Sequence, residues 1–175
     1  MGPSPTIGRN APDVACFLSY ASFSRGGSMG SRRRDLSPIR GTGSCLCGAV
    51  RYEVYGPLRA VVACHCSQCR RTSGNFAAFT ATRPEDLVLI ESGELRWYRS
   101  SATARRGFCG VCGSNLFWEP ASGERISIAA GTLDPPTGLT TAAHVFVGDA
   151  SDYYAIEDDL PHRADGDHGI AIPDD

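Results

Sequence analysis

Apolar and polar residues alternate in the central part of the chain. In residues 49–55 every even position is apolar, with Val50, Tyr52 and Val54, and the charged residues Arg51 and Glu53 fall on odd positions. A period of two is typical of a strand with one buried face, because successive side chains point to opposite sides. The sequence therefore predicts a strand here, with its even positions in the core.

Seven further short runs have a similar apolar character. They are residues 58–63, 76–82, 87–90, 95–98, 116–118, 126–129 and 144–147. Turn-forming dipeptides such as Gly56-Pro57 and Ser92-Gly93 separate them. No stretch has the 3.6-residue period of a long amphipathic helix. The predicted fold class is therefore mainly β.

Composition divides the chain into three parts. Residues 1–40 are rich in Gly, Pro, Ser and Arg without sustained periodicity, which is typical of a disordered leader. Residues 41–161 contain the predicted strands and form one domain of ordinary size. Residues 162–175 form an acidic tail with little to bury, which we expect to be disordered. Because Met29 lies in the leader, it is an alternative start to Met1.

Charge and hydropathy narrow the possible partners. A formal charge of -2 argues against nonspecific attraction to nucleic acid or to anionic membranes. All 17 basic residues are arginines, which excludes Schiff-base chemistry by lysine and phosphate loops that depend on lysine. No apolar run approaches the length of a membrane span. We expect a cytoplasmic protein, with a signal or transit peptide in the leader as the less favoured alternative.

Seven of the eight cysteines fall into three clusters. The clusters are Cys45-x-Cys47, Cys64-x-Cys66-x-x-Cys69 and Cys109-x-x-Cys112, and the eighth cysteine is Cys16 in the leader. In a reducing compartment, closely spaced cysteines indicate metal ligands before they indicate disulfides. Thiolate-rich sets of this kind favour zinc.

The last cluster has the form of a zinc knuckle. A tight turn between two strands would aim the sulfurs of Cys109 and Cys112 at one point, and Gly113 would relieve crowding where backbone amides approach them. Two ligands cannot close a tetrahedral site. Cys45 and Cys47, which are also followed by a glycine, are the natural partners. The sequence thus predicts a structural zinc on four cysteines.

The middle cluster offers three cysteines, Cys64, Cys66 and Cys69, and no fourth. Three protein ligands and an open position are what a catalytic zinc needs to bind a substrate, so we predict a second, reactive zinc here. Two alternatives remain: a fourth ligand from His65 or His144, which would make the site structural, or a redox dithiol of Cys66 and Cys69. Because His65 lies between two ligands, its side chain should point away from the metal and orient a thiolate or the substrate indirectly.

Six spaced segments form a wider pattern. They are Cys45-x-Cys47-Gly48-x-Val50-x-Tyr52, Cys64-His65-Cys66-x-x-Cys69-Arg70 with Ser73-Gly74, Phe108-Cys109-x-x-Cys112-Gly113-Ser114, Gly131-x-Leu133-Asp134, His144-x-Phe146-Val147 and Asp158-Asp159-Leu160-Pro161. Together they resemble the glutathione-dependent formaldehyde-activating enzyme family, which also includes centromere protein V. The resemblance covers roughly residues 41–161.

This resemblance implies coiled, tent-like β-sheets with zinc-knuckle hairpins and two zinc ions per chain. The implied ligands are Cys45, Cys47, Cys109 and Cys112 for the structural ion, and Cys64, Cys66 and Cys69 for the catalytic ion. The implied activity is that of a carbon–sulfur lyase, which makes or breaks the bond between a thiol and formaldehyde, as in S-hydroxymethylglutathione.

The chemistry of the residues agrees with a sulfur substrate. Zinc held by three thiolates is a soft site at which a substrate thiol can bind, deprotonate and attack an aldehyde. Arg70 and Arg71 follow the last ligand and are candidates to hold a substrate carboxylate, and Ser73 is a candidate hydrogen-bonding group. The expected partners are a small thiol and an aldehyde, or their adduct. The alternative is a nonenzymatic zinc module for protein or nucleic acid, supported by Arg105-Arg106 beside the knuckle.

Overall fold

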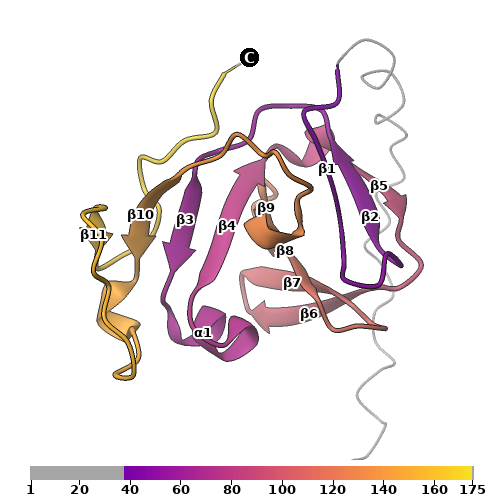
Figure 1. The fold of residues 1–175 in the computed structure, drawn as a ribbon. Helices are drawn as coiled ribbons and strands as arrows, with labels where there is room; N and C mark the ends of the chain where they lie inside the picture. The colour runs from indigo at the N-terminus through magenta and orange to yellow at the C-terminus, as the bar shows by residue number, and fades with distance from the viewer. Residues whose placement is uncertain (1–37, 175) are drawn as a thin grey trace, which may run out of the picture.

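Residues 38–174 are described by the structure, a computed structural model (Figure 1). The predictions on Cys16, on Met29 and on the leader up to residue 37 lie outside the described residues. The described strands are β1 (Gly41–Ser44), β2 (Arg51–Val54), β3 (Val61–Cys64), β4 (Ala77–Thr82), β5 (Leu87–Glu91), β6 (Leu95–Ser101), β7 (Ala104–Cys109), β8 (Asn115–Pro120), β9 (Ile126–Ala129), β10 (Thr141–Val145) and β11 (His162–Arg163). They are joined by one α-helix, α1 (Ser67–Ser73), and by 3-10 turns at Pro84–Asp86, Ala130–Thr132 and Val147–Asp149.

The strands form two open sheets. The smaller is antiparallel, in the order β1-β2-β5, and the larger runs β11-β10-β3-β4-β9-β8-β7-β6. The larger sheet is antiparallel except where β10 pairs with β3 and with β11. Figure 1 shows the smaller sheet on one side of the molecule, and β10 and β11 at the opposite edge. The prediction of a mainly β fold is confirmed. Within the described residues, no helix is both long enough and apolar enough to span a membrane.

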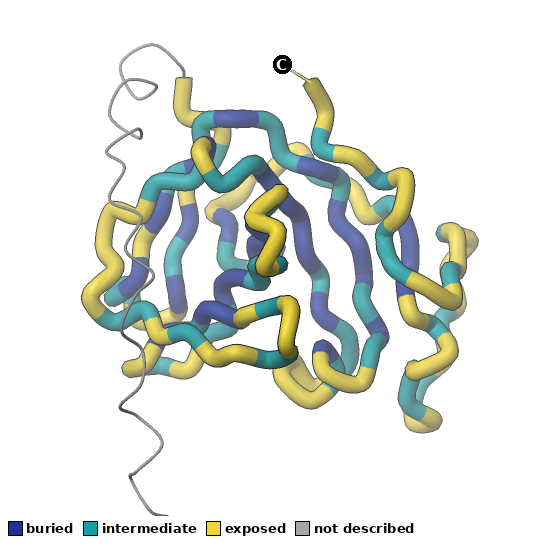
Figure 2. Tube along the Cα trace, turned by 180° about the vertical axis from the view of Figure 1, so that it is seen from behind, coloured by how far each residue is buried: buried dark blue, intermediate teal, exposed yellow. Residues whose placement is uncertain are grey.

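The main core lies between the two sheets, as the dark blue segments of Figure 2 show. The apolar residues at even positions in and just before β2 are buried, as their alternation predicts. Their exposed fractions are 0% for Val50, 1% for Tyr52 and 0% for Val54. The ring of Tyr52 packs edge-to-face on Phe117 of β8, with centroids 5.3 Å apart. Burial of each large apolar side chain contributes about 1.5–3 kcal/mol. This core fixes the smaller sheet, and with it the loop from β1 to β2, against the β7–β8 hairpin.

Two elements near the cysteines differ from the sequence expectation. The apolar pattern does not indicate strand β7, because its Ala-Arg-Arg-Gly-Phe-Cys sequence has no apolar alternation; the zinc knuckle alone implies a strand before Cys109. In the structure Arg105 is exposed, whereas Arg106 and the next residue are both buried, so burial along β7 does not alternate regularly. Helix α1 is too short to give a periodic signal. It begins after Cys66, whose sulfur accepts the Cys69 N–H, and ends at Gly74 with a φ of 92°.

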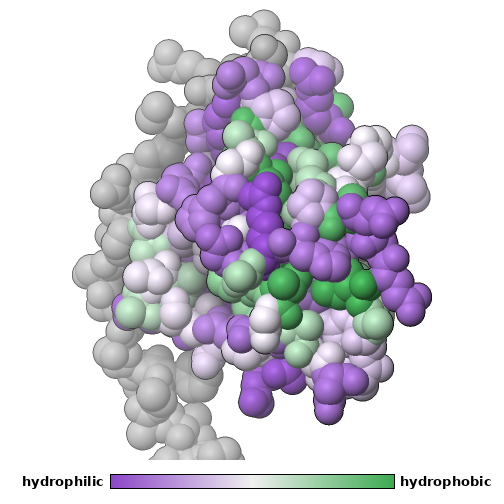
Figure 3. Space-filling view, turned by 90° about the vertical axis from the view of Figure 1, so that its left-hand side faces the viewer, coloured by the Kyte–Doolittle hydropathy of each residue, from purple (hydrophilic) through white to green (hydrophobic). Residues whose placement is uncertain are grey.

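The C-terminal segment is not the free acidic tail that we expected for residues 162–175. Its described part pairs β11 with β10, and Asp167 bridges the guanidinium groups of Arg59 and Arg125. The physical reason is charge: Arg59 is only 1% exposed, and a buried cation requires a counterion. The sequence does not reveal that Arg59 is buried. The surface seen from the side of β10 and β11 is mostly hydrophilic, with apolar side chains gathered in one part of it (Figure 3).

Candidate active site and metal centres

The four-cysteine cluster, which consists of Cys45, Cys47, Cys109 and Cys112, joins two parts of the chain that are far apart in sequence. Cys45 and Cys47 lie in the loop between β1 and β2, whereas Cys109 ends β7 and Cys112 lies in the turn to β8. Their four sulfurs lie within 4.8 Å of one another. The structure therefore brings together the two cysteine pairs that the sequence predicted to meet.

The geometry of this cluster fits a tetrahedral zinc. Two thiolates on one zinc lie about 3.8 Å apart, because Zn–S bonds are about 2.3 Å long. The observed Sγ separations are 3.6 Å for Cys45 and Cys47 and 3.8 Å for Cys47 and Cys109. The Val50 N–H donates to the sulfur of Cys45 at 3.3 Å. Hydrogen bonds from Ser114 lower the pKa of Cys112 to about 5, which favours the thiolate that a metal requires.

The glycines that follow each cysteine pair have a different role from the predicted one. Gly48 and Gly113 adopt φ values of 77° and 75°, in the left-handed region. A Cβ atom at either position would meet nothing within 4 Å, so crowding is not the reason for glycine. The reason is the backbone conformation, which turns each loop back toward its own sulfurs at no steric cost.

The three-cysteine cluster, which consists of Cys64, Cys66 and Cys69, is built by one strand end and one short helix. Cys64 is the last residue of β3, Cys66 precedes α1, and Cys69 lies in its first turn. The three sulfurs lie within 4.8 Å of one another. Contacts with the sulfurs of Cys64 and Cys69 lower the pKa of Cys66 to about 2, whereas the contact with Cys66 raises the pKa of Cys64. The three sulfurs thus favour the thiolate form at Cys66, and their number and kind fit zinc.

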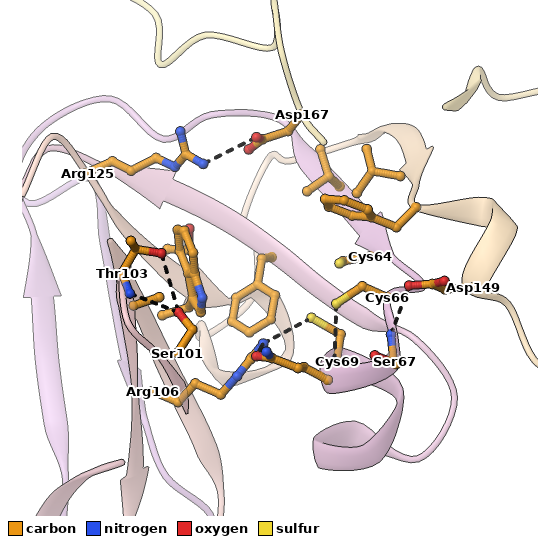
Figure 4. Close-up of a pocket in the computed structure, with 18 of the residues that line it drawn as sticks. Cys64, Cys66, Ser67, Cys69, Ser101, Thr103, Arg106, Arg125, Asp149 and Asp167 are labelled. Atoms are coloured by element: carbon orange, nitrogen blue, oxygen red, sulfur yellow. Dashed lines mark hydrogen bonds and ion pairs between the residues drawn. The ribbon is translucent and has the colours of Figure 1, made fainter. Parts of the chain in front are cut away.

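A cavity of about 350 Å³ opens beside the three-cysteine cluster. In Figure 4 the sulfurs lie on one side of it, and Arg125 and Asp167 lie across from them. Apolar side chains form much of its wall: Val62, Phe79, Trp118, Val145 and Phe146. A more polar hollow of about 520 Å³ lies beside the four-cysteine cluster, but Cys47 is the one cysteine of that cluster that lines it. The cavity beside the three-cysteine cluster is lined by all three of its cysteines, so a bound molecule can reach all three sulfurs.

Three arginines line this cavity, and sequence reasoning assigned none of them to the substrate. Burial lowers the pKa of Arg59, and the charge of Asp167 opposes that shift. Arg125 shares the same carboxylate at 3.2 Å and lies over the ring of Trp118. Arg106 reaches from β7 to the sulfur of Cys69 at 3.6 Å. These three come from separate parts of the sequence, so no local motif could have identified them together.

The predicted substrate-binding residues lie elsewhere. Arg70, Arg71 and Ser73 are on α1, but none of them is among the residues that line the cavity beside the three sulfurs. Arg71 and Ser73 are exposed, and Ser73 instead borders a separate hollow near Asn115. A role of these three residues in substrate binding stays a prediction.

His65 and His144, the suggested fourth ligands, are joined to each other and not to the sulfurs. His65 is fully buried, with Nδ1 bonded to the Tyr154 hydroxyl and Nε2 to Nδ1 of His144 at 2.7 Å. His144 Nε2 lies 2.9 Å from an Asp158 oxygen. Burial lowers the pKa of His65, so its ring stays neutral. Both nitrogens of each ring have partners, and neither ring joins a cysteine cluster within residues 38–174.

The hydrogen-bonded chain has one consistent assignment when both rings are neutral. Asp158 accepts from Nε2–H of His144, whose Nδ1 then accepts from Nε2–H of His65. The remaining nitrogen of His65 accepts the Tyr154 O–H. As expected, the His65 side chain points away from the cluster. Its hydrogen bonds to Tyr154 and His144 hold in place the backbone between Cys64 and Cys66, and it forms no hydrogen bond with a thiolate. His144 and Asp158 belong to the segments that carry the family resemblance, and in this chain they bond to each other.

Comparisons with known proteins follow the same residues. Residues 40–149 match the family described as glutathione-dependent formaldehyde-activating enzyme. The chain is 31% identical over 114 residues to an uncharacterized lyase of Schizosaccharomyces pombe. The matched region covers 64% of this chain and 82% of that protein. It is 29% identical over 129 residues to a Halomonas elongata protein named "Putative glutathione-dependent formaldehyde-activating enzyme", covering 66% of this chain and 80% of that protein.

A solved structure of a Rhodobacter sphaeroides protein is also similar, with 29% identity and a TM-score of 0.49 over 57% of this chain and 97% of that chain. The family match spans more than half of the sequence and includes all seven cysteines of the two clusters. The chain therefore belongs to the glutathione-dependent formaldehyde-activating enzyme family.

Proposed function

We propose that the protein is a zinc-dependent carbon–sulfur lyase that makes or breaks the adduct between a small thiol and an aldehyde, such as S-hydroxymethylglutathione. Family membership and the names of two relatives support a lyase. The observation that carries the finer proposal is the contrast between the clusters. Four sulfurs close one cluster, whereas three sulfurs face a cavity and have no fourth protein donor among the described residues.

Each cluster would hold one zinc ion. Cys45, Cys47, Cys109 and Cys112 supply the four donors of a structural site, and Cys64, Cys66 and Cys69 supply three donors of a reactive one. When bound there, zinc would supply a soft Lewis acid that favours the thiolate form of a substrate thiol. The remaining steps depend on the chain's own side chains.

The cavity provides the surroundings that the reaction needs. Phe79 and Trp118 form apolar walls that reduce access of water to the reacting groups. Arg106 places a positive charge beside Cys69 and balances the negative charge of three thiolates around a dication. In the synthetic direction, the substrate thiolate adds its electron pair to the aldehyde carbon, and the carbonyl oxygen takes a proton. The reverse reaction returns the electron pair of the carbon–sulfur bond to sulfur.

The rival function, a zinc module that binds nucleic acid or protein, finds no support in the arginine pair that suggested it. Arg105 is exposed, pairs with Glu119 at 2.6 Å and lies over Trp97. Arg106 is 7% exposed and points into the cavity. Because consecutive residues of β7 face opposite sides of the sheet, the two cations do not form one basic surface.

The proposal is tested by turnover with formaldehyde and several thiols, followed by nuclear magnetic resonance of the adduct. We expect Cys66→Ser to abolish the protein-dependent rate. Cys16→Ser is the matched control, since it makes the same chemical change at the cysteine outside both clusters. A wild-type rate no faster than the uncatalysed reaction with every thiol, or an equal rate in Cys66→Ser, would contradict the proposal.

A further inference from the structure

Arg106 is a buried cation with unused hydrogen-bonding capacity. Its side chain is 7% exposed and lines the cavity beside the three-cysteine cluster. Its Nη2 contacts the sulfur of Cys69 at 3.6 Å and Oε1 of Gln68 at 3.4 Å. Its Nε–H is buried without a hydrogen-bond partner, and no carboxylate in residues 38–174 forms an ion pair with it. Buried donors of this kind are uncommon and indicate a missing partner.

The other two arginines of the cavity also have a buried Nε–H without a partner, but they have a counterion that Arg106 lacks. Arg59 and Arg125 share the carboxylate of Asp167, so the chain itself supplies their anion. In Figure 4 that ion pair lies across the cavity from the sulfurs, whereas Arg106 points toward Cys69. Among the arginines of this cavity, Arg106 is therefore the one that is available to an anion of the bound molecule.

The position of Arg106 determines which negatively charged group of the bound molecule it can contact. A substrate sulfur that joins the three cysteine sulfurs becomes a neighbour of Cys69, the sulfur that Arg106 contacts. In a thiol–aldehyde adduct the oxygen is two bonds from that sulfur. A carboxylate elsewhere on a larger thiol is several bonds farther away. The oxygen of the reacting carbon is thus the atom that Arg106 reaches first.

We propose that Arg106 is a catalytic residue that binds the oxygen on which negative charge develops as the carbon–sulfur bond forms or breaks. This inference rests on the proposed function. When the thiolate adds to the aldehyde, the electron pair of the carbonyl bond moves to oxygen, and Arg106 donates hydrogen bonds to that oxygen. The oxygen then takes its proton from water, while Arg106 only donates hydrogen bonds. In the reverse direction water accepts the hydroxyl proton before sulfur leaves.

Binding can be measured without turnover by comparing two thiols of equal length. Mercaptoacetate and 2-mercaptoethanol both carry oxygen close to sulfur, but only mercaptoacetate is anionic there. Cobalt in place of zinc gives thiolate charge-transfer bands whose shift reports thiol binding. We expect wild-type protein to prefer mercaptoacetate by roughly tenfold, because a charge-assisted hydrogen bond is stronger than a neutral one. Arg106→Gln should abolish that preference, and Arg106→Lys should keep part of it.

Arg105→Gln is the matched control, because it removes the neighbouring charge from the opposite face of β7. It should leave the preference unchanged. Turnover of 2-mercaptoethanol with formaldehyde adds a second test, since this thiol has no carboxylate. Arg106→Gln should lower kcat for it about a hundredfold with little change in the KM for the thiol, as expected for loss of a donor to a developing oxyanion.

The outcomes separate this inference from the proposed function. If wild-type protein binds neither thiol, the proposed function fails. If it binds both thiols equally, or if Arg106→Gln keeps the preference and the kcat, the role of Arg106 is wrong while the lyase proposal stands. If Arg106→Gln and Arg106→Lys both lose cobalt from the three-cysteine cluster alone, Arg106 serves only to balance the charge of the thiolates, and the inference is overturned.

Discussion

The two cysteine clusters use the same donor atom for different purposes. In the four-cysteine cluster the ligands come from two hairpin loops. Cys47 of one loop and Cys109 of the other are 62 residues apart in the sequence, so the cluster crosslinks two distant parts of the core. In the three-cysteine cluster the ligands come from six consecutive residues that are already held by β3 and α1. The four-cysteine cluster holds two distant loops together, whereas the three-cysteine cluster exposes its sulfurs to a cavity. Ligand number and loop separation together distinguish the structural site from the reactive one.

The largest effect should come from breaking the four-cysteine cluster. Cys109→Ser removes one donor from a closed site whose metal binding is coupled to folding, a linkage worth about 10–16 kcal/mol in structural zinc sites. We expect insoluble or unfolded protein, measured by solubility and far-ultraviolet circular dichroism. Cys45→Ser should behave alike, because both sulfurs are almost fully buried in the core. Native folding of either variant would show that the cluster is not structural.

The matching change in the three-cysteine cluster should spare the fold. Cys66→Ser is expected to lower the zinc content from about two ions to about one per chain while circular dichroism stays native, because β3 and α1 are held by protein contacts. Metal analysis of the purified variant is the measurement. If this variant unfolds as Cys109→Ser does, the two clusters are both structural, and the contrast between them disappears.

A smaller effect should come from the far side of the cavity. Asp167→Asn leaves the buried guanidinium of Arg59 without its counterion, which should cost about 3 kcal/mol of unfolding free energy. Chemical denaturation measures the change. Asp174→Asn is the control from the same acidic segment, because Asp174 is fully exposed and pairs only with the surface residue Arg83. Equal stability of both variants would show that the C-terminal segment does not support the cavity.

The smallest effect on stability should come from the hydrogen bond between Tyr154 and His65, beside the three-cysteine cluster. Tyr154→Phe removes the hydroxyl that bonds to Nδ1 of His65 and should cost about 1 kcal/mol of unfolding free energy. Tyr98→Phe, at an exposed site, is the control and should be silent. Thermal unfolding provides the comparison. The zinc content of Tyr154→Phe should remain that of the wild type, and loss of zinc would mean that His65 contributes directly to the metal site.

Much of the fold and both clusters were predictable from local patterns. The alternation of Val50, Tyr52 and Val54 predicted their burial, and the cysteine spacings predicted which sulfurs meet. These features can be recognised in the sequence because each depends on a period of two or on residues within one turn. The apolar pattern does not indicate strand β7, because a buried arginine, Arg106, occupies a position where the pattern requires an apolar residue.

The walls of the cavity could not be predicted in the same way. Arg59, Arg106, Arg125 and Asp167 come from four separate segments, and their meeting depends on the order of strands in the larger sheet. Proximity in sequence pointed instead to Arg70 and Arg71, which directly follow the last cysteine. Neither of these two arginines lines the cavity, and Cys69 is the buried residue of α1. Their role in substrate binding stays a prediction.

The most direct test of the difference between the clusters is a crystal structure of the protein with zinc and a small thiol, read with anomalous scattering at the zinc edge. We predict one zinc on Cys45, Cys47, Cys109 and Cys112 with no further ligand, and a second zinc on Cys64, Cys66 and Cys69 with the thiol sulfur as its fourth ligand. A fourth protein ligand on the second zinc, or a thiol bound at the first, would contradict this prediction.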